Sequence, residues 1–369
     1  MAIAAAILAV FVYGMVIVIP GSIKLRLVDR IGLDDAQVGQ VLTLWQITTL
    51  LLTLGIGPLL DRLGHRGVLV CGFVLVAAAL WRFAVAERLA GVFAAAVLLG
   101  AGGSCLNTAG NTLLPMLNPS NPAAASNLGN VFFGLGAFLV PFAIACLFER
   151  LRYTRAVAVL AAIPALALVP ALTARYPPIS AGVHRVATLS LLESPAVILA
   201  GCMLFCMVGL EVSMASWTTT YLRKIGFHEQ RAVLLFSLLW VAKIAGRLIA
   251  SQAVTTGTAK SAIQFMSLAT AACFLLLTIT RNRKLAGVTV PGLGLFFGPI
   301  FPTTIGAMFA RTSPALYGTV FSIVYACGLA GSSSVPYLVG HLSKTRSIQT
   351  GYRLLGAISI VLFILASLL

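Results

Sequence analysis

This sequence contains few charged residues. Only 9% of its 369 residues are charged and nine are acidic, whereas 60% are hydrophobic and the mean hydropathy is +1.02. One soluble core cannot hide that much apolar surface, so the composition excludes a soluble enzyme. Apolar runs recur from end to end. Helices are their expected form, because backbone that faces lipid must satisfy its hydrogen bonds within its own segment.

The apolar runs predict an all-α membrane protein with twelve transmembrane helices. Both termini then lie on the same side of the membrane. No basic leader with a cleavage site precedes the first run, so we expect that run to be retained. The predicted spans are residues 1–26, 36–60, 67–86, 89–116, 123–148, 155–173, 194–222, 229–254, 261–280, 285–310, 316–340 and 350–369.

The cysteines have no metal-ligating residues near them in the sequence. All seven cysteines fall inside apolar spans without the neighbours that a metal site needs, so we interpret them as packing residues. The sequence predicts no disulfide framework, no metal site and no cofactor. The cysteines are Cys71, Cys105, Cys146, Cys202, Cys206, Cys273 and Cys327.

The least hydrophobic connection, residues 173–192, divides the spans six and six. A repeat supports the division, since Gly136 precedes Val140-Pro141 by the same spacing as Gly331 precedes Val335-Pro336. Two parallel six-helix repeats favour a solute site near mid-depth that opens to alternate sides. We therefore predict an N-terminal six-helix bundle at 1–173, a cytoplasmic linker at 174–192 and a C-terminal six-helix bundle at 193–369.

Glycine and proline mark where helices are expected to pack closely or bend. Glycines at 100, 102, 103, 134, 136, 292, 294 and 298 allow close helix approach. Three prolines, Pro291, Pro299 and Pro302, are expected to bend the tenth span.

A short polar segment, residues 57–67, separates the second and third spans. It contains Gly57, Asp61-Arg62, Gly64 and Arg66, and it resembles the signature loop of the major facilitator superfamily. In that family the loop is cytoplasmic, and its carboxylate and arginine lock the two halves together in the outward-open state. The resemblance implies that Asp61 and Arg62 act in a conformational gate with Gly57, Gly64 and Arg66. His65 stands where that family usually has an arginine.

Within the superfamily, the chain is most similar to the fucose and glucose/galactose permease group. The similarity is carried by Val208-Gly209-Leu210-Glu211-Val212-Ser213, Thr220-Tyr221-Leu222, Gly246-Arg247-Leu248 and Gly298-Pro299-Ile300-Phe301-Pro302-Thr303. Fucose permease-like proton symporters carry an acidic residue in the first helix and another in the fourth. Here the first span has Tyr13, and the fourth has Asn107 in that position. Uniport and symport of a proton or sodium ion through Glu211 therefore both stay open.

Two ionisable residues are predicted at mid-membrane. Glu211 and Lys243 lie on adjacent antiparallel spans, at depths that differ by only ~4 to 5 Å at a rise of ~1.5 Å per residue. A buried charge needs a partner or a wet cavity, so an ion pair is expected. As a functional pair, Glu211 binds a sugar hydroxyl or a coupling cation. As a structural pair, the two residues only fix two helices together.

Neutral polar and aromatic residues complete the predicted substrate site. Asn107 and Asn111 share one face of the fourth span, and an amide suits a hydroxyl-rich solute because it both donates and accepts. The alternative is that these amides only make interhelical hydrogen bonds. The complete set of candidates for substrate binding is Gln46, Asn107, Asn111, Asn130, Glu211, Trp217, Lys243 and Tyr325.

Loop charges and the signature loop give opposite orientations. With both termini in the cytoplasm, seven Lys and Arg residues fall on the cytoplasmic side, Arg247 among them, and sixteen on the outer side. We follow the signature loop and place the termini in the cytoplasm, with the chain in the inner membrane. The net charge of +16 is spread over membrane-flanking loops. Lipid headgroups rather than nucleic acid are therefore its expected partners.

The sequence thus predicts a monomeric secondary or facilitative transporter that works by alternating access. Its expected substrate is a small polar solute, a sugar or sugar derivative. The alternative is an exporter of an amphipathic compound or lipid. An intramembrane enzyme is not expected, because that would need clustered His, Cys, Asp or Glu at mid-depth.

Overall fold

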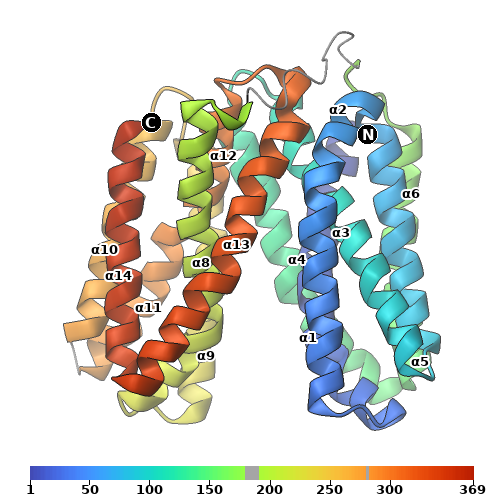
Figure 1. Cartoon of the computed structure of the whole chain (residues 1–369), viewed down its shortest axis with the longest axis horizontal. Helices are drawn as coiled ribbons and strands as arrows, with labels where there is room; N and C mark the ends of the chain where they lie inside the picture. Colours follow the sequence, from blue (N-terminus) through green and yellow to red (C-terminus); the bar gives the residue numbers. More distant parts are fainter. Residues whose placement is uncertain (179–190, 280–281) are drawn as a thin grey trace. The chain divides into compact units, whose positions relative to one another are not determined.

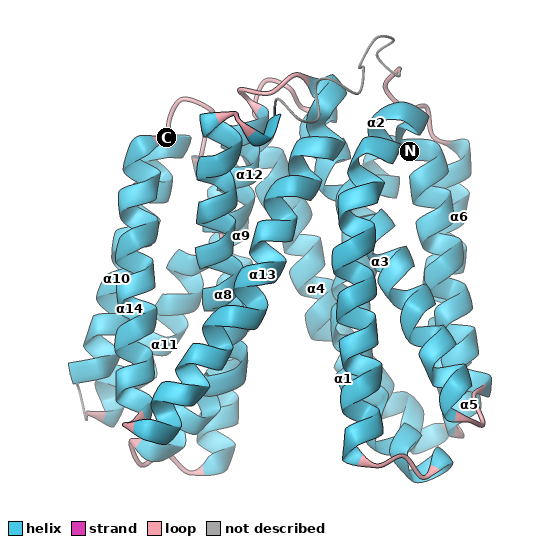
Figure 2. Cartoon of the chain, in the orientation of Figure 1, coloured by secondary structure: helices cyan, strands magenta, loops and turns pink. Residues whose placement is uncertain are grey.

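The computed structural model describes residues 1–178, 191–279 and 282–369. Every regular element in these ranges is helical, and Figure 2 shows no strand among them. Eleven of the described helices are long and apolar enough to cross a membrane, and one of them, α2 (Asp35–Val85), is 51 residues long and contains two of the predicted spans. Eleven helices plus this second span agree with the twelve spans expected. The predicted all-α membrane fold is confirmed.

The helices follow the predicted spans to within a few residues (Figure 1). The first half of the chain contains α1 (Ala2–Ile31), α2, α3 (Leu89–Leu117), α4 (Pro122–Arg150), α5 (Tyr153–Leu160) and α6 (Ala162–Thr173). The second contains α8 (Pro195–Lys224), α9 (Glu229–Ala253), α10 (Ala259–Ile279), α11 (Arg283–Phe297), α12 (Ile300–Phe309), the 3-10 helix η1 (Pro314–Leu316), α13 (Tyr317–Thr345) and α14 (Ile348–Leu368).

The turn between α1 and α2 is encoded locally. Gly32 ends α1 with φ 74°, a left-handed conformation that glycine adopts without a steric penalty. Asp34 then caps α2, because its carboxylate accepts a hydrogen bond from the Gln37 amide at 2.7 Å while the Gln37 side chain accepts one from the Asp34 amide at 3.1 Å. Two short signals therefore set both helix ends.

The polar segment at 57–67 is helical except at Gly64. This residue has φ 74° and ψ 172°, a backbone conformation that is essentially restricted to glycine. The two spans of α2 meet at this break. The sequence placed a loop between the spans, and the structure narrows that loop to a single residue.

The tenth span is interrupted where proline is dense. α11 ends at Phe297 and α12 begins at Ile300, so the break lies at Gly298-Pro299. Pro291 is accommodated within α11. The predicted bend is confirmed, and it is localised beside the second of the three prolines.

The chain divides into two compact units. Unit 1 comprises Met1–Leu117, Phe132–His184 and Ser313–Ser322, and unit 2 comprises Asn118–Val131, Arg185–Thr312 and Ile323–Leu369. The first turns of α4 therefore group with unit 2, and those of α13 with unit 1. The bundles expected at 1–173 and 193–369 stay a prediction. The expected linker at 174–192 lies mostly outside the described residues.

Candidate functional site

The predicted pair of ionisable residues meets inside unit 2. The Lys243 ammonium on α9 lies 2.5 Å from the Glu211 carboxylate on α8. Their side chains are 2% and 22% exposed. Lys243 is thus enclosed, whereas Glu211 keeps one accessible edge. The salt bridge expected between these two helices is present.

A second buried cation, Arg247, lies one helical turn beyond Lys243. Its exposure is 2%; its Nε donates to the Gly298 carbonyl at 3.0 Å and its Nη1 to the Asn130 carbonyl at 2.8 Å. The assignment of Arg247 to the cytoplasmic loop charges was therefore wrong. The signal for its true position was its spacing of four from Lys243, which puts both cations on one face of α9.

Glycines bring α11 close enough to α9 to enclose these cations. A Cβ at Gly298 would lie 2.8 Å from Lys243 Cγ, and Cβ atoms at Gly246 and Gly294 would collide with backbone oxygens of the facing helix. Aromatic rings cover the ammonium of Lys243, which stands 4.5 Å from the ring centre of Trp240 and 5.7 Å from that of Phe297. Such cation–π contacts stabilise a desolvated cation.

The three residues Glu211, Lys243 and Arg247 form a buried charged cluster. It holds two cations and one carboxylate, within helices that are otherwise apolar. Charges inside a membrane-spanning segment need compensation from partners or a wet cavity. Chemically, the cluster can accept hydrogen bonds from solute hydroxyls at Glu211. It can also exchange its carboxylate–ammonium contact for a contact with a bound cation.

The amide pair of the fourth span is also formed, in unit 1. Asn111 Nδ2 donates to Asn107 Oδ1 at 2.9 Å and to the Asn107 carbonyl at 3.0 Å on α3. Both residues are buried, at 6% and 2% exposure. Asn107 Nδ2 has no hydrogen-bond partner among the residues that the structure describes. A buried donor of this kind is available to an incoming hydroxyl group.

Other polar residues of unit 1 hold helices together. Ser104 of α3 donates to the Thr49 carbonyl of α2 at 3.1 Å, and Thr53 donates to Ser104 at 3.3 Å. His65, which replaces an arginine of the signature loop, is 6% exposed, and its Nε2 lies 3.1 Å from Thr112 Oγ1. It therefore joins α2 to α3 and adds no cation to the exterior.

The remaining candidates lie in different surroundings. The Asn130 side chain bonds within α4, to the Ser126 carbonyl, and its own carbonyl accepts from Arg247. Tyr325 is 8% exposed, and its ring meets Phe301 edge-on at 6.3 Å. Trp217 is half-buried near the end of α8, and Gln46 is exposed on α2. Asn130 thus contacts the charged cluster, through its carbonyl and the Arg247 guanidinium.

Asp61, the carboxylate of the predicted gate, accepts three hydrogen bonds from another helix. Its carboxylate accepts hydrogen bonds from the amides of Gly318 and Thr319, both at 2.8 Å, and from the Thr319 hydroxyl at 2.6 Å. These donors lie in the first turn of α13, within unit 1. Asp61 therefore caps this helix, where a carboxylate is favoured by unpaired amides and by the helix dipole.

Two glycines make that contact possible. A Cβ at Gly318 would stand 2.6 Å from Asp61 Oδ1, and a Cβ at Gly57 would overlap Gly318 and Ser322. Arg62 is exposed, with no partner among the described residues, whereas Arg66 donates to the Leu172 carbonyl at 2.8 Å. Of the predicted gate residues, Asp61 and Gly57 thus take part in the contact with α13. Arg62 makes no recorded contact there.

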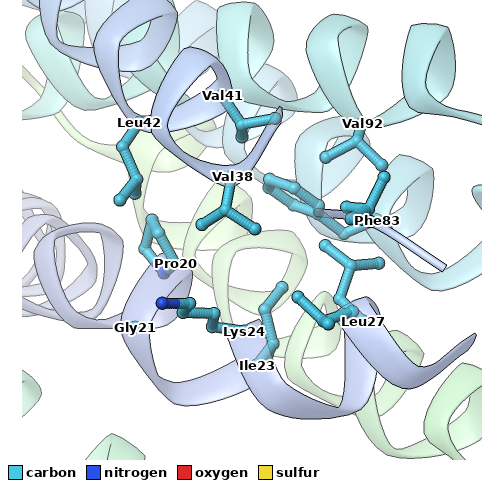
Figure 3. Close-up of a pocket in the computed structure, with 12 residues that line it drawn as sticks. Pro20, Gly21, Ile23, Lys24, Leu27, Val38, Val41, Leu42, Phe83 and Val92 are labelled. Atoms are coloured by element: carbon cyan, nitrogen blue, oxygen red, sulfur yellow. The ribbon is translucent and has the colours of Figure 1, made fainter. Parts of the chain in front are cut away.

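An apolar cavity in unit 1 is too small for a solute. Figure 3 shows it between α1 and α2, lined by residues such as Ile23, Leu27, Val38 and Phe83, with the Lys24 side chain at one side. Its volume is about 50 Å³. Sites for small molecules occupy roughly 300 to 1,000 Å³. This cavity is therefore a packing gap.

The sequence model of the family described as Major Facilitator Superfamily matches residues 5–333 of this chain. The chain belongs to the Major Facilitator Superfamily. It is a multi-pass integral membrane protein. The family predicted from the signature loop is confirmed.

Solved structures of superfamily members share the fold over essentially the whole chain. FucP, a Major Facilitator Superfamily transporter in the outward conformation, matches with a TM-score of 0.85 and 16% identity, covering 100% of this chain and 98% of its own. The Escherichia coli fucose:proton symporter FucP matches at 0.81 and 17%, with coverages of 99% and 98%. The human organic anion transporter MFSD10 (TETRAN) matches at 0.75 and 17%, with 99% and 97%.

A curated sequence relative matches over a shorter length. It is Bypass of stop codon protein 6 of Saccharomyces cerevisiae, 25% identical over 170 residues. The match takes in 43% of this chain and 34% of that relative, so the chain spans about a third of the relative's length. The identities to the solved structures are lower still, so they establish the fold and leave the substrate to be argued from this chain's own residues.

Proposed function

We propose that this chain is a secondary transporter of a small polyhydroxylated solute, a sugar or sugar derivative, which works by alternating access. The observation that carries the proposal is the buried charged cluster of Glu211, Lys243 and Arg247. Its one accessible group is a carboxylate, which suits solute hydroxyls and a coupling cation equally. The fold likeness to a fucose:proton symporter supports the same class of substrate.

In the proposed cycle, Glu211 exchanges partners. Without solute its carboxylate contacts Lys243, which keeps it ionised through direct attraction. A proton or sodium ion that binds Glu211 weakens this contact, and a solute hydroxyl then donates to the freed oxygen. Asn107 and Asn111 supply amides that discriminate against analogues lacking a hydroxyl, because a mismatched analogue leaves a buried amide unpaired.

The Asp61 contact is proposed to act as the conformational gate. Three hydrogen bonds to the first turn of α13 hold one arrangement of the helices. Transport requires that they break in the other. Removal of the carboxylate by Asp61→Asn is expected to increase the population of the arrangement in which the contact is open.

The coupling role of Glu211 is tested by Glu211→Gln in proteoliposomes loaded for sugar uptake. If Glu211 couples transport to a cation gradient, the variant loses concentrative uptake and keeps solute exchange across the membrane at zero gradient. The matched control is Glu229→Gln, which neutralises an exposed carboxylate at the start of α9. Elution of the variant as a monodisperse species separates a functional loss from a folding loss.

Normal accumulation by Glu211→Gln excludes Glu211 as the coupling group. Accumulation by neither the native protein nor the variant, with exchange in both, indicates a uniporter. A panel of sugars, sugar acids and amphipathic compounds in the same vesicles identifies the substrate class. Transport confined to the amphipathic compounds would overturn the proposal in favour of an exporter. The buried amides and the charged cluster favour the polar solute.

We further propose that the protein is a monomer of the inner membrane with both termini in the cytoplasm. On this orientation the loop before α4 is cytoplasmic, and the loop between α8 and α9 is exterior. Single cysteines at Ser120→Cys and His228→Cys, both exposed positions, test it in a cysteine-free background. A membrane-impermeant maleimide added to whole cells is expected to label the second and not the first. The reverse pattern contradicts the orientation.

A further inference from the structure

A depression of about 720 Å³ lies at the end of unit 2, where α8 and α13 finish. This volume is within the range of small-molecule sites. Four of its ten described lining residues are basic, and none of these ten is acidic. The lining includes Trp217, Thr220, Arg223 and Lys224 of α8, Lys344 of α13, and Arg346, which follows α13.

The two helices present these residues by regular spacing. On α8, positions 217, 220 and 224 follow one another at intervals of three and four, so they share one face. The facing helix α13 has Gly340, where a Cβ would stand 3.0 Å from the Trp217 ring. The absence of a side chain at Gly340 lets the indole lie against α13. Within unit 2, α8 also packs closely against the part of α13 after Ser322, where a Cβ at Gly331 would collide with the Phe205 carbonyl.

The four cations of this depression are unpaired. Within the described ranges, the side chains of Arg223, Lys224, Lys344 and Arg346 make no hydrogen bond and no ion pair. By contrast, Arg30 in unit 1 donates to the Ala84 carbonyl at 2.6 Å and to the Thr154 hydroxyl at 3.0 Å. Like charges along a concave wall reinforce one another and raise the local concentration of anions. The depression is therefore a positively charged pocket with free donors.

We propose that this pocket binds small organic anions of the sugar-acid type, with a carboxylate on a ring that bears hydroxyl groups. The two guanidinium groups offer paired donors that match a carboxylate. Trp217 offers an apolar face for the ring, and the Thr220 hydroxyl, which makes no hydrogen bond within the described ranges, is available to a solute hydroxyl. A phosphate-bearing lipid headgroup presents related chemistry, and the experiment below separates the two.

This pocket is distinct from the charged cluster. Trp217 follows Glu211 by six residues, which is about 9 Å along a helix. On the proposed orientation the pocket opens to the exterior, where it would collect solute ahead of transport. That role rests on the proposed function. Binding itself does not, because it requires neither Glu211 nor a conformational cycle.

The experiment is equilibrium binding of glucuronate to the purified full chain in detergent, with glucose as the neutral comparison. In Lys344→Gln/Arg346→Gln, glucuronate affinity is expected to fall about tenfold or more, and the native protein in high salt is expected to show a similar fall. The matched control is Arg231→Gln/Lys284→Gln. It removes two exposed cations near the same end, outside the pocket lining, since Arg283 beside Lys284 contacts Gly226 in the loop after α8.

Three outcomes would overturn the proposal. The first is unchanged glucuronate binding in the pocket variant, and the second is an equal loss in the control. The third is a native protein that ignores glucuronate and binds short-chain phosphatidylglycerol, which would make the pocket a headgroup site. The pocket variant keeps Glu211, Lys243 and Arg247 in place, so its loss of glucuronate binding reports on the pocket and not on the charged cluster. If the transport proposal fails, the glucuronate binding measurement therefore still tests the pocket.

Discussion

The interiors of the two units use different polar chemistry. Buried polar residues of unit 1 are neutral amides and hydroxyls such as Asn107, Asn111 and Ser104, joined by His65. In the described part of the chain, the buried Lys and Arg residues are Lys243 and Arg247, both in unit 2. Neutral groups can form hydrogen bonds with a solute, whereas the carboxylate of unit 2 can also bind a proton or another cation. On the proposed function, coupling would therefore fall to unit 2.

Removal of one charge from the buried pair in unit 2 is expected to cause the largest loss of stability. Lys243→Met leaves the Glu211 carboxylate without its direct partner, and breaking a buried pair destabilises by about 3 to 5 kcal/mol. The double variant Glu211→Gln/Lys243→Met is expected to recover most of that loss, because no unpaired charge remains. Thermal and denaturant unfolding in detergent measure both, with Arg231→Gln as the exposed control. A double variant no more stable than the single one contradicts the comparison.

A methyl group between α9 and the end of α11 is expected to cause the next largest loss of stability. Gly298→Ala places a Cβ 2.8 Å from Lys243 Cγ, and overpacking of this kind destabilises by about 1 to 3 kcal/mol. Gly292→Ala is the matched control, since nothing lies within 4 Å of its Cβ position. We expect the control to unfold at or slightly above the native temperature, as Ala favours helix over Gly. Equal effects at both positions would show that the charged cluster is loosely packed.

The carboxylate at the end of unit 1 tests whether that unit also depends on charge. Asp61→Ala removes the cap of α13, a loss of about 0.5 to 2 kcal/mol for capping residues. Arg62→Ala, in contrast, is expected to leave the unfolding temperature unchanged, because its guanidinium has no partner within the described ranges. Comparison of the two unfolding midpoints measures the difference. A larger effect at Arg62 would refute the assignment of the contact to the carboxylate alone.

The smallest expected effect on stability belongs to the amide pair. Asn111→Ala removes the hydrogen bond to Asn107 Oδ1, and interhelical and intramembrane hydrogen bonds average about 0.6 kcal/mol. Selectivity is expected to change more than stability, so uptake of a sugar should be compared with uptake of its deoxy analogue. If the ratio of sugar uptake to deoxy-sugar uptake does not change, the pair has only a structural role. Solute recognition would then have to be assigned to unit 2 alone.

The sequence predicted the elements of the fold well because each has a local signal. Long apolar runs predicted the spans, the polar segment at 57–67 predicted the separation of the second and third spans, and the three prolines of the tenth span predicted its bend. The Glu211–Lys243 pair followed from depth alone, since two charges in apolar helices at similar depth have few other partners. These predictions needed only the spacing along single helices.

What the sequence missed depends on how helices approach one another. Arg247 was assigned to a loop because charge near a helix end is usually solvated, and its acceptors are backbone carbonyls that no side-chain pattern reveals. The resemblance implied gate roles for both Asp61 and Arg62, whereas the recorded hydrogen bonds to α13 come to the Asp61 carboxylate. Trp217 lines the basic pocket, and its role in substrate binding stays a prediction. Rotation and distance between helices decide each case.

The way Arg247 is held has a consequence for mutational tolerance. Its acceptors at positions 130 and 298 belong to the main chain, so they persist whatever side chain occupies those positions. Replacement of Asn130 by another small residue should leave the guanidinium anchored. Arg247 itself is not expected to tolerate substitution, because its guanidinium group donates to two separate segments of the chain. Randomised libraries of this region should therefore accept diversity at 130 and reject even lysine at 247.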